Sequence, residues 1–454
     1  MTDAPTAPPP RPTRARQAAA WLAYVALAVG LVYLVVVSFR RWDVLLVSVA
    51  TLSALVVAAW FAVSRRGRPR VVALAVVVLA LVLLTVVLLA SDSLRVLLVG
   101  LLLAATSTAS ARVALHQPSV DPSAAPTAPR PRHAVLIMNP RSGGGKVERF
   151  ALEQQCRDRG VEPIVLGPGS DLLAIAEDAV QRGADVIGMA GGDGSQALVA
   201  SVASRHGVPF VVVPAGTRNH FALDLGLDRA DVVGALDAFD DGVERRIDLA
   251  ELNGRVFVNN ASMGLYAKIV QSPAYRDAKV ATAADILPDL IGPDAAPLDL
   301  RFTLPSGEEA ATANLVLVSN NSYQLSHIRG AATRPLLDDG LLGIVTVQVR
   351  GALDAEKLAA LEAAGLVRRF SGWNEWTATE FEVHSAGPVE VGVDGEALTI
   401  EPPLRFSIRP RALTVRLPRA ALSRPTAPPA VHISSAPTLA ALWRTALGRP
   451  AAGS

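Results

Sequence analysis

Long apolar runs dominate the first quarter of the chain. Each run has about the length, ~20 residues, that spans the hydrocarbon core of a bilayer as a helix. The runs are Trp21–Phe39, Val44–Val63, Val71–Ala90 and Val96–Leu115, the last of which is diluted by Thr106, Ser107, Thr108 and Ser110. A signal peptide would give a single apolar stretch near the start, so the repetition predicts an integral, multi-pass membrane protein with four spans.

Arginines predict the orientation of these spans. Arg11, Arg14 and Arg16 precede the first span, and four more arginines lie between residues 65 and 70, in the loop between the second and third spans. Arginine-rich segments stay on the cytoplasmic side, although Arg40 in the first outer loop opposes this bias. Four spans with this orientation leave both ends of the chain in the cytoplasm, at the cell membrane.

Strand-like and helix-like segments alternate after a Pro-rich stretch that ends near residue 131. The expected strands are 133–138, 161–166, 185–190 and 209–213, and the expected helices are 147–159, 171–182 with Ser170 as its cap, and 196–205. Successive βα units of this kind predict a parallel sheet with right-handed crossovers.

The periodicity changes after Asn260, where apolar and polar residues alternate between turn residues. The expected strands are 298–304, 313–319, 343–349, 380–385, 389–393 and 404–417, with one strong helix at 355–364 that Asp354 caps. This pattern predicts a second, β-rich domain, a sandwich. A short apolar helix is expected at 439–447, within a tail rich in Pro, Ser and Ala.

Composition excludes several kinds of protein. The chain has 454 residues, 43 Lys and Arg, 41 Asp and Glu, and a net charge of +2, which is too balanced to predict a nucleic-acid partner. Its single cysteine, Cys156, permits neither an intramolecular disulfide nor a cysteine zinc cluster. Cys156 occupies an apolar position of an expected helix, so we expect it in the core.

Three glycine-rich loops each follow an apolar, strand-like run. They are Asn139-Pro140-Arg141-Ser142-Gly143-Gly144-Gly145, Gly191-Gly192-Asp193-Gly194-Ser195 and Pro214-Ala215-Gly216-Thr217-Arg218-Asn219. Such loops present bare backbone N–H groups to phosphate, and the carboxyl ends of parallel strands share one edge of the sheet. One loop would be an ordinary turn, but three in register predict a phosphoryl-transfer enzyme.

Two common phosphate-binding motifs do not fit these loops. A Walker A motif would require glycine at Pro140 and a hydroxyl residue at Val147. Gly192-x-Gly194-x-x-Ala197 matches a dinucleotide fingerprint, but the next strand ends at Val213 without a carboxylate to hold a ribose. We therefore discard both motifs.

Taken together, the loops resemble the catalytic domain of the diacylglycerol kinase family, which includes sphingosine, ceramide and bacterial lipid kinases. Three further blocks follow in family order, Asn259–Gly264, Asp338–Leu341 and Val393–Glu396. The resemblance covers residues 131–419. It implies a NAD-kinase-like α/β nucleotide-binding domain followed by a β-sandwich that takes a lipid substrate from the membrane, with ATP and Mg²⁺ as cofactors. Diacylglycerol, phosphorylated to phosphatidic acid, is the expected substrate.

The expected division of the chain follows from these patterns. It comprises a disordered N-terminus (1–19), transmembrane helices (20–116), a Pro-rich linker (117–131), an α/β nucleotide-binding domain (132–257), a β-rich lipid-substrate domain (258–419) and a flexible C-terminal tail (420–454).

The resemblance also implies roles for individual residues. The nucleotide-binding residues are Asn139, Ser142, Gly143, Gly144, Gly191, Gly192, Asp193, Gly194, Ser195, Gly216, Thr217 and Asn219. Asp394 is the expected general base and Glu396 its supporting carboxylate, while Asp193 and Asp339 are the expected Mg²⁺ ligands. By their local sequence alone, Asp394-Gly395 is a hairpin-turn signal and Asp193 a capping aspartate.

One departure from the family pattern stays open. Many members carry an aspartate after the residue equivalent to Asn219, whereas this chain has His220, which offers no hard oxygen to magnesium. Either Asp193 and phosphate oxygens hold the ion alone, or substrate binds differently; His220 is also explained as a helix-start residue.

Two other functions remain as alternatives. NAD kinases and phosphofructokinases share the Gly-Gly-Asp-Gly-Ser loop and act on soluble substrates, and an inactive kinase scaffold would make a membrane sensor. The membrane spans and the first glycine loop favour a lipid kinase. No short motif identifies the lipid, and homo-oligomer formation is left open.

Overall fold

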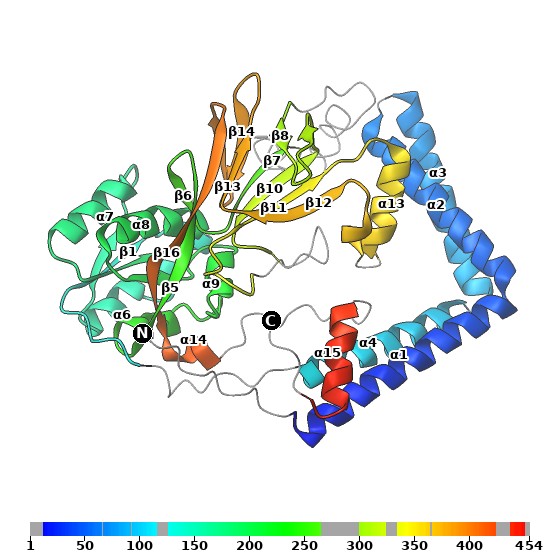
Figure 1. The fold of residues 1–454 in the computed structure, drawn as a ribbon, viewed down its shortest axis with the longest axis horizontal. Helices are drawn as coiled ribbons and strands as arrows, with labels where there is room; N and C mark the ends of the chain where they lie inside the picture. Colours follow the sequence, from blue (N-terminus) through cyan, green and yellow to red (C-terminus); the bar gives the residue numbers. More distant parts are fainter. Residues whose placement is uncertain are drawn as a thin grey trace. The chain divides into compact units, whose positions relative to one another are not determined.

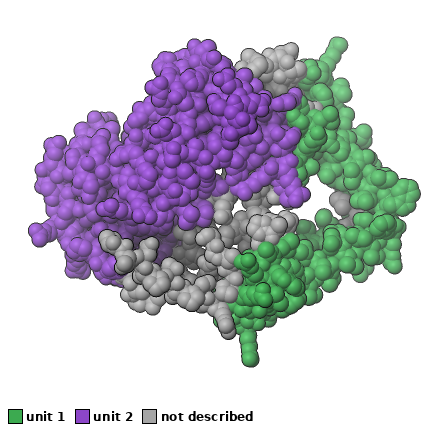
Figure 2. Space-filling view, viewed as in Figure 1, with its two compact units in different colours: residues 1–118, 351–365, 428–454 green, residues 119–350, 366–427 purple. Residues whose placement is uncertain are grey.

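The structure, a computed structural model, divides into two compact units (Figure 2). The helical unit comprises residues 1–118, 351–365 and 428–454, and the sheet unit comprises residues 119–350 and 366–427. The structure describes residues 12–65, 67–91, 93–115, 126–264, 299–323, 334–363, 366–423 and 436–449. Residues 1–11 of the expected disordered N-terminus, 116 at the end of the expected transmembrane segment, 117–125 of the expected linker, and 424–435 and 450–454 of the expected tail lie outside the described residues.

Four long helices form most of the helical unit (Figure 1). They are α1 (Arg14–Arg40), α2 (Trp42–Ser64), α3 (Arg68–Ala90) and α4 (Ser93–Leu115). Each is long and apolar enough to cross a membrane. The four apolar helices predicted from the sequence are therefore present.

Helix α1 packs against α4 through small side chains. Ala20, Ala23, Ala111 and Ala114 are buried in this contact, as is typical where helices approach closely within a bilayer. The hydroxyl of Ser107 donates to the Ala23 carbonyl at 2.8 Å, so this polar residue of the fourth span links two helices. Thr106 and Thr108 each donate to a carbonyl four residues earlier, which removes the cost of placing them in an apolar segment.

Two short helices complete the helical unit. Helix α15 (Ala436–Ala446), within the expected flexible tail, packs on α1 and α4, and Tyr24 donates its hydroxyl to the Leu439 carbonyl at 2.6 Å. Helix α13 (Ala352–Ala363) packs on α2 and begins before Asp354, which is therefore inside the helix rather than its cap.

The sheet unit begins with the predicted α/β alternation. Its first strands are β1 (Ala134–Met138), β2 (Glu162–Val165), β3 (Val186–Ala190) and β4 (Phe210–Val213), which are parallel in the order β2-β1-β3-β4. The connecting helices are α5 (Lys146–Arg149), α6 (Leu152–Asp158), α7 (Leu172–Gln181), α8 (Asp193–His206) and α9 (His220–Asp224). Apolar clusters cover both faces of this sheet, as expected for a parallel sheet.

Some local details differ from the sequence prediction. The expected helix 147–159 is broken into α5 and α6 by Ala151, whose φ of 47° is left-handed. Asp171, not Ser170, caps α7 by accepting from the Ala174 N–H, while the Ser170 hydroxyl accepts from Gly167. Cys156 is buried as expected, and burial raises its pKa to about 12.

A second, antiparallel sheet follows. Its order is β12-β11-β10-β7-β14-β15, with bounds β7 (Asn260–Gly264), β10 (Leu315–Asn320), β11 (Leu342–Val347), β12 (Trp373–Ala378), β14 (Val389–Val393) and β15 (Glu396–Ile400). A small hairpin joins β8 (Phe302–Thr303) and β9 (Glu309–Ala310), so only part of the expected strand 298–304 forms, and its first residue lies outside the described residues. Shorter elements are η3 (Gly234–Phe239), η4 (Val367–Arg369) and α14 (Arg419–Ser423).

The two parts of the sheet unit share strands. β5 (Gly242–Leu252), β6 (Arg255–Phe257), β13 (Glu380–Val383) and β16 (Leu404–Pro418) extend the first sheet, where β16 runs parallel to β4 and antiparallel to β5. Residues 404–408 of β16 contribute to the core of the sandwich and residues 413–417 to that of the α/β part, with a register shift between Arg409 and Leu413. The fold class predicted from the sequence is confirmed, and β16 contributes to the cores of both parts of the sheet unit.

Candidate functional site

The three glycine loops meet at the carboxyl edge of the parallel sheet. The N–H of Gly216 donates to the Gly191 carbonyl at 2.9 Å, which joins the second and third loops. A Cβ on Gly143 would lie 2.3 Å from the Ala215 carbonyl oxygen, and Gly143 has a φ of 55°. Gly143 is therefore required both by its backbone conformation and by the close approach of the third loop.

Lys146 and Asn219 fix the third loop. The ammonium group of Lys146 donates to the carbonyls of Pro214 at 3.2 Å and Gly216 at 3.0 Å, and the amide of Asn219 donates to the same two carbonyls at 3.0 and 2.9 Å. Burial lowers the pKa of Lys146, and Arg149 and Arg229 lower it further. Both side chains thus hold the loops in place.

Gln196 is a residue of the site that the sequence analysis missed. Its amide is buried below the loops and donates to the carbonyls of Met189 at 2.8 Å and Val213 at 3.1 Å, which joins the ends of β3 and β4. Its signal in the sequence is a polar side chain among the small apolar residues that α8 buries.

Backbone N–H groups converge above this framework. Helix α8 begins at Asp193 directly after Gly191 and Gly192, so its first-turn N–H groups have no carbonyl partner within the helix. The loop of residues 139–145 contains the short helix η2 (Ser142–Gly144). Ser142 and Ser195 are partly buried and Thr217 is exposed beside these groups. Such an edge can hold a polyphosphate.

Asp193 caps a neighbouring helix. Its two carboxylate oxygens accept from the N–H groups of His220 at 3.1 Å and Phe221 at 3.2 Å, the first two residues of α9. His220 is therefore a helix-start residue that donates its backbone N–H to Asp193. Each carboxylate oxygen retains a further lone pair.

Asp394 occupies the turn between β14 and β15. Its φ of 47° and the φ of 86° at Gly395 are both left-handed, as a two-residue hairpin turn requires. The carboxylate accepts from the N–H groups of Val258 and Asn259 at 2.8 Å and from that of Asn260 at 3.2 Å. The hairpin interpretation of Asp394-Gly395 is correct, and the turn also brings a carboxylate to the junction of the two sheets.

The surroundings of Asp394 raise the pKa of its carboxyl group. Burial raises the pKa of Asp394 to about 7, the three backbone hydrogen bonds oppose this shift, and the carboxylate of Asp193 adds to it. A carboxylate with this pKa is suited to accept a proton near neutral pH.

Glu396 lies against the second glycine loop. A Cβ on Gly194 would lie 2.5 Å from Oε1 of Glu396, so the bare backbone of Gly194 makes room for this carboxylate. Arg255 pairs with Glu396 at 2.8 Å. The structure therefore brings together Asp193 from the α/β part and Asp394 and Glu396 from the β-rich part, which are far apart in the sequence.

Asp339 belongs to a second, separate polar cluster. The amide of Asn321 donates to carboxylate oxygens of both Asp339 and Asp248, and Asp248 also accepts from the N–H groups of Gly340 and Arg411 at 2.7 Å. Asp248 is fully buried, and the sequence analysis missed it. This cluster joins β5, β10 and the bulge of β16.

A magnesium ion requires hard oxygen ligands such as carboxylates. Among the described residues, no group of three or more His, Cys, Asp or Glu side chains gathers to hold a metal. Magnesium bound to nucleotides usually takes one or two carboxylates, with phosphate oxygens and waters as the other ligands. Asp193, with its remaining lone pairs at the edge where the glycine loops meet, fits that requirement.

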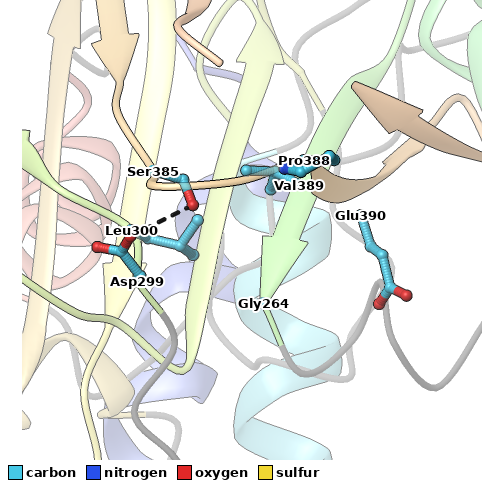
Figure 3. Close-up of a pocket in the computed structure, with 7 residues that line it drawn as sticks. All are labelled: Gly264, Asp299, Leu300, Ser385, Pro388, Val389 and Glu390. Atoms are coloured by element: carbon cyan, nitrogen blue, oxygen red, sulfur yellow. Dashed lines mark hydrogen bonds between the residues drawn. The ribbon is translucent and has the colours of Figure 1, made fainter. Parts of the chain in front are cut away.

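A pocket elsewhere in the β-rich part is distinct from this site. Figure 3 shows its lining, with Asp299 and Ser385 facing each other at a hydrogen-bond distance of 3.5 Å. The pocket has a volume of about 230 Å³ and lies at the start of β14, whereas Asp394 follows the end of that strand. The five residues of β14 therefore separate the pocket from Asp394 by roughly 15 Å.

Comparisons with known proteins give relatives that are described as lipid or diacylglycerol kinases. Residues 133–252 match the family of the diacylglycerol kinase catalytic domain. A Pseudomonas aeruginosa protein described as "Probable lipid kinase YegS-like" is 29% identical over 298 residues, which cover 63% of this chain and 94% of that protein. The Bacillus subtilis diacylglycerol kinase is 34% identical over 139 residues, which cover 29% of this chain and 46% of that protein.

A solved structure supports the same fold. The crystal structure described as a "putative diacylglycerol kinase" from Bacillus anthracis aligns with a TM-score of 0.50 at 18% identity, covering 63% of this chain and 98% of that chain. The resemblance to the diacylglycerol kinase catalytic-domain family is confirmed, and the four apolar helices lie outside the matched residues.

Proposed function

We propose that this chain is a lipid kinase of the cell membrane, which transfers the γ-phosphate of ATP to a lipid hydroxyl and has diacylglycerol as its expected substrate. The observation that carries the proposal is the position of Asp394, a carboxylate with a pKa near 7 beside the phosphate-binding edge. The relatives described as lipid and diacylglycerol kinases support the choice of a lipid. The four apolar helices support catalysis at the bilayer. The arginines before the first helix and between the second and third support a cytoplasmic position for the sheet unit.

The residues of the site divide the work of phosphoryl transfer. The three glycine loops and the start of α8 bind the phosphates of ATP through backbone N–H groups. Asp394 takes the proton of the lipid hydroxyl as that oxygen attacks the γ-phosphorus, and ADP leaves. Glu396 lies against the second loop, where its pairing with Arg255 fixes its position.

Magnesium has a place in this scheme. Asp193 would hold it together with phosphate oxygens, and the ion would neutralise charge on the transferring group. Asp339 would belong to a second, structural site that supports the fold away from the phosphates.

The test uses the full-length protein in mixed micelles. Diacylglycerol, sphingosine and a polyprenol are supplied together with NAD, labelled ATP and magnesium, and the products are identified by mass. We expect a phosphorylated lipid, with phosphatidic acid as the main product. Phosphorylation of NAD alone would indicate a soluble-substrate kinase, and no phosphorylated product would indicate an inactive sensor; either result overturns the proposal.

A further inference from the structure

A fully buried arginine, Arg334, lies outside all of the sequence motifs. It follows the residues 324–333 that the structure does not describe and precedes the Asp338–Leu341 block. Arg334 is 1% exposed. Burying a guanidinium group is costly unless its donors are paired, so its partners indicate what the charge does there.

Arg334 forms a buried ion pair with Asp224, the last residue of α9. Its Nε and Nη2 lie 2.8 and 2.7 Å from Oδ2 of Asp224. The first residues of this helix are capped by Asp193. Arg334 thus pairs with the last residue of α9, and Asp193 of the candidate site caps the first residues of the same helix.

The remaining donors of Arg334 reach the loop that binds Asp394. Nη1 donates to the carbonyls of Val258 and Asn320, and Nη2 donates to Oδ1 of Asn259 at 2.8 Å. The same Val258 and Asn259 present their N–H groups to the Asp394 carboxylate. The guanidinium therefore binds the Val258 carbonyl and the Asn259 side chain, while the backbone N–H groups of the same two residues face Asp394.

Tyr323 and Asn260 close the arrangement on one side. The guanidinium carbon of Arg334 lies 5.5 Å from the centre of the Tyr323 ring, and the amide of Asn260 donates to the Tyr323 hydroxyl at 3.1 Å. Loop residues 258–260 each donate to Asp394 and are each tied, directly or through Tyr323, to Arg334.

We infer that Arg334 is a positioning residue, which orients the 258–260 loop so that its N–H groups hold the Asp394 carboxylate facing the phosphate-binding edge. Through Asp224 it also contacts the end of α9, whose first residues Asp193 caps. This inference rests on the proposed function for its effect on turnover, but its structural consequence is measurable without any substrate.

The chain offers a matched control for the loss of a buried arginine. Arg416 is also 1% exposed, and its guanidinium donates to the carbonyls of Ala238 at 2.6 Å and Pro129 at 2.8 Å. Arg334→Lys and Arg416→Lys both replace a planar guanidinium group, which has five N–H donors, by a single ammonium group. Only the first replacement affects the loop around Asp394.

Hydrogen exchange of the full-length protein tests the positioning role directly. We expect Arg334→Lys to increase exchange of the amides of residues 258–260 by about tenfold or more, because the N–H bonds to Asp394 open more often. Arg416→Lys is expected to leave that exchange unchanged. If Arg334→Lys fails to fold, Asn259→Ala removes one link of Arg334 and keeps the pair with Asp224; it should increase exchange of the same loop.

Kinetics then separate positioning from binding. We expect Arg334→Lys to lower kcat by about 10- to 100-fold with KM for ATP within about twofold, as for other groups that orient a reactive residue. Unchanged exchange at residues 258–260, or equal effects of the two arginine variants, would overturn the inference. Increased exchange in a protein that phosphorylates no lipid would support the positioning role and reject the proposed function.

Discussion

The pH dependence of turnover follows from the environment of Asp394. With a pKa of about 7, the carboxylate is half deprotonated at pH 7 and about 1% deprotonated at pH 5, so turnover is expected to fall about 50-fold between these values. An aspartate that kept its ordinary pKa of 3.8 would lose only about 6% of its basic form over the same interval.

Asp394→Asn tests the same group by removing its basicity. We expect turnover to fall by about a hundredfold or more, the usual contribution of a general base. The amide cannot accept from all three backbone N–H groups, because its nitrogen is itself a donor and faces the N–H of either Val258 or Asn259. One unsatisfied N–H costs about 1–3 kcal/mol of stability, and in the variant this cost does not change with pH.

The raised pKa of Asp394 also predicts how the stability of the folded protein depends on pH. The pKa of Asp394 is higher in the folded protein than its ordinary value, so the folded state binds the proton more tightly. Asp394 therefore favours folding at low pH, and this contribution is lost as the pH rises from about 4 to about 7. The wild-type protein should lose thermal stability over that range relative to Asp394→Asn.

The assay is single-turnover phosphate transfer from labelled ATP to diacylglycerol in mixed micelles between pH 5 and 8. Nucleotide affinity is measured at each pH, so that a change in binding is not taken for a change in chemistry. A wild-type rate that is constant from pH 5 to 7, or full turnover of Asp394→Asn, would refute the assignment of Asp394 as the base.

Three other predictions follow from the structure. Gly143→Ala should abolish nucleotide binding in titrations, because its Cβ would collide with the Ala215 carbonyl. Gly144→Ala has no atom within 4 Å of the added Cβ and should keep measurable binding; an equal loss in both variants would point to backbone strain alone. Asp339→Ala should lower the thermal midpoint more than the affinity for ATP, since Asn321 links Asp339 to the buried Asp248; an equal loss of ATP affinity would place Asp339 in the active centre. Reporters fused after residue 131 and within the loop 64–70 should both report the cytoplasm, and an external reporter at the first position would show that the fourth helix does not span.

The sequence by itself determined the parts whose signals are local. Runs of apolar residues predicted four membrane-length helices, because a bilayer requires about 20 apolar residues in succession. The alternation of strands and helices predicted the parallel sheet, since βα units admit few other arrangements. Glycine loops after three strands predicted one phosphate-binding edge, because parallel strands end on the same side.

Only the tertiary structure decided which distant groups meet. The hairpin at Asp394 brings a carboxylate to Asp193, although the local sequence gives only a turn. The pair of Asp224 and Arg334 has no local signal, because two charged side chains far apart in sequence stabilise each other only after folding removes both from water. Strand β16 likewise belongs to both cores: its buried side chains alternate within each half, and the register shift between Arg409 and Leu413 changes the phase of that alternation.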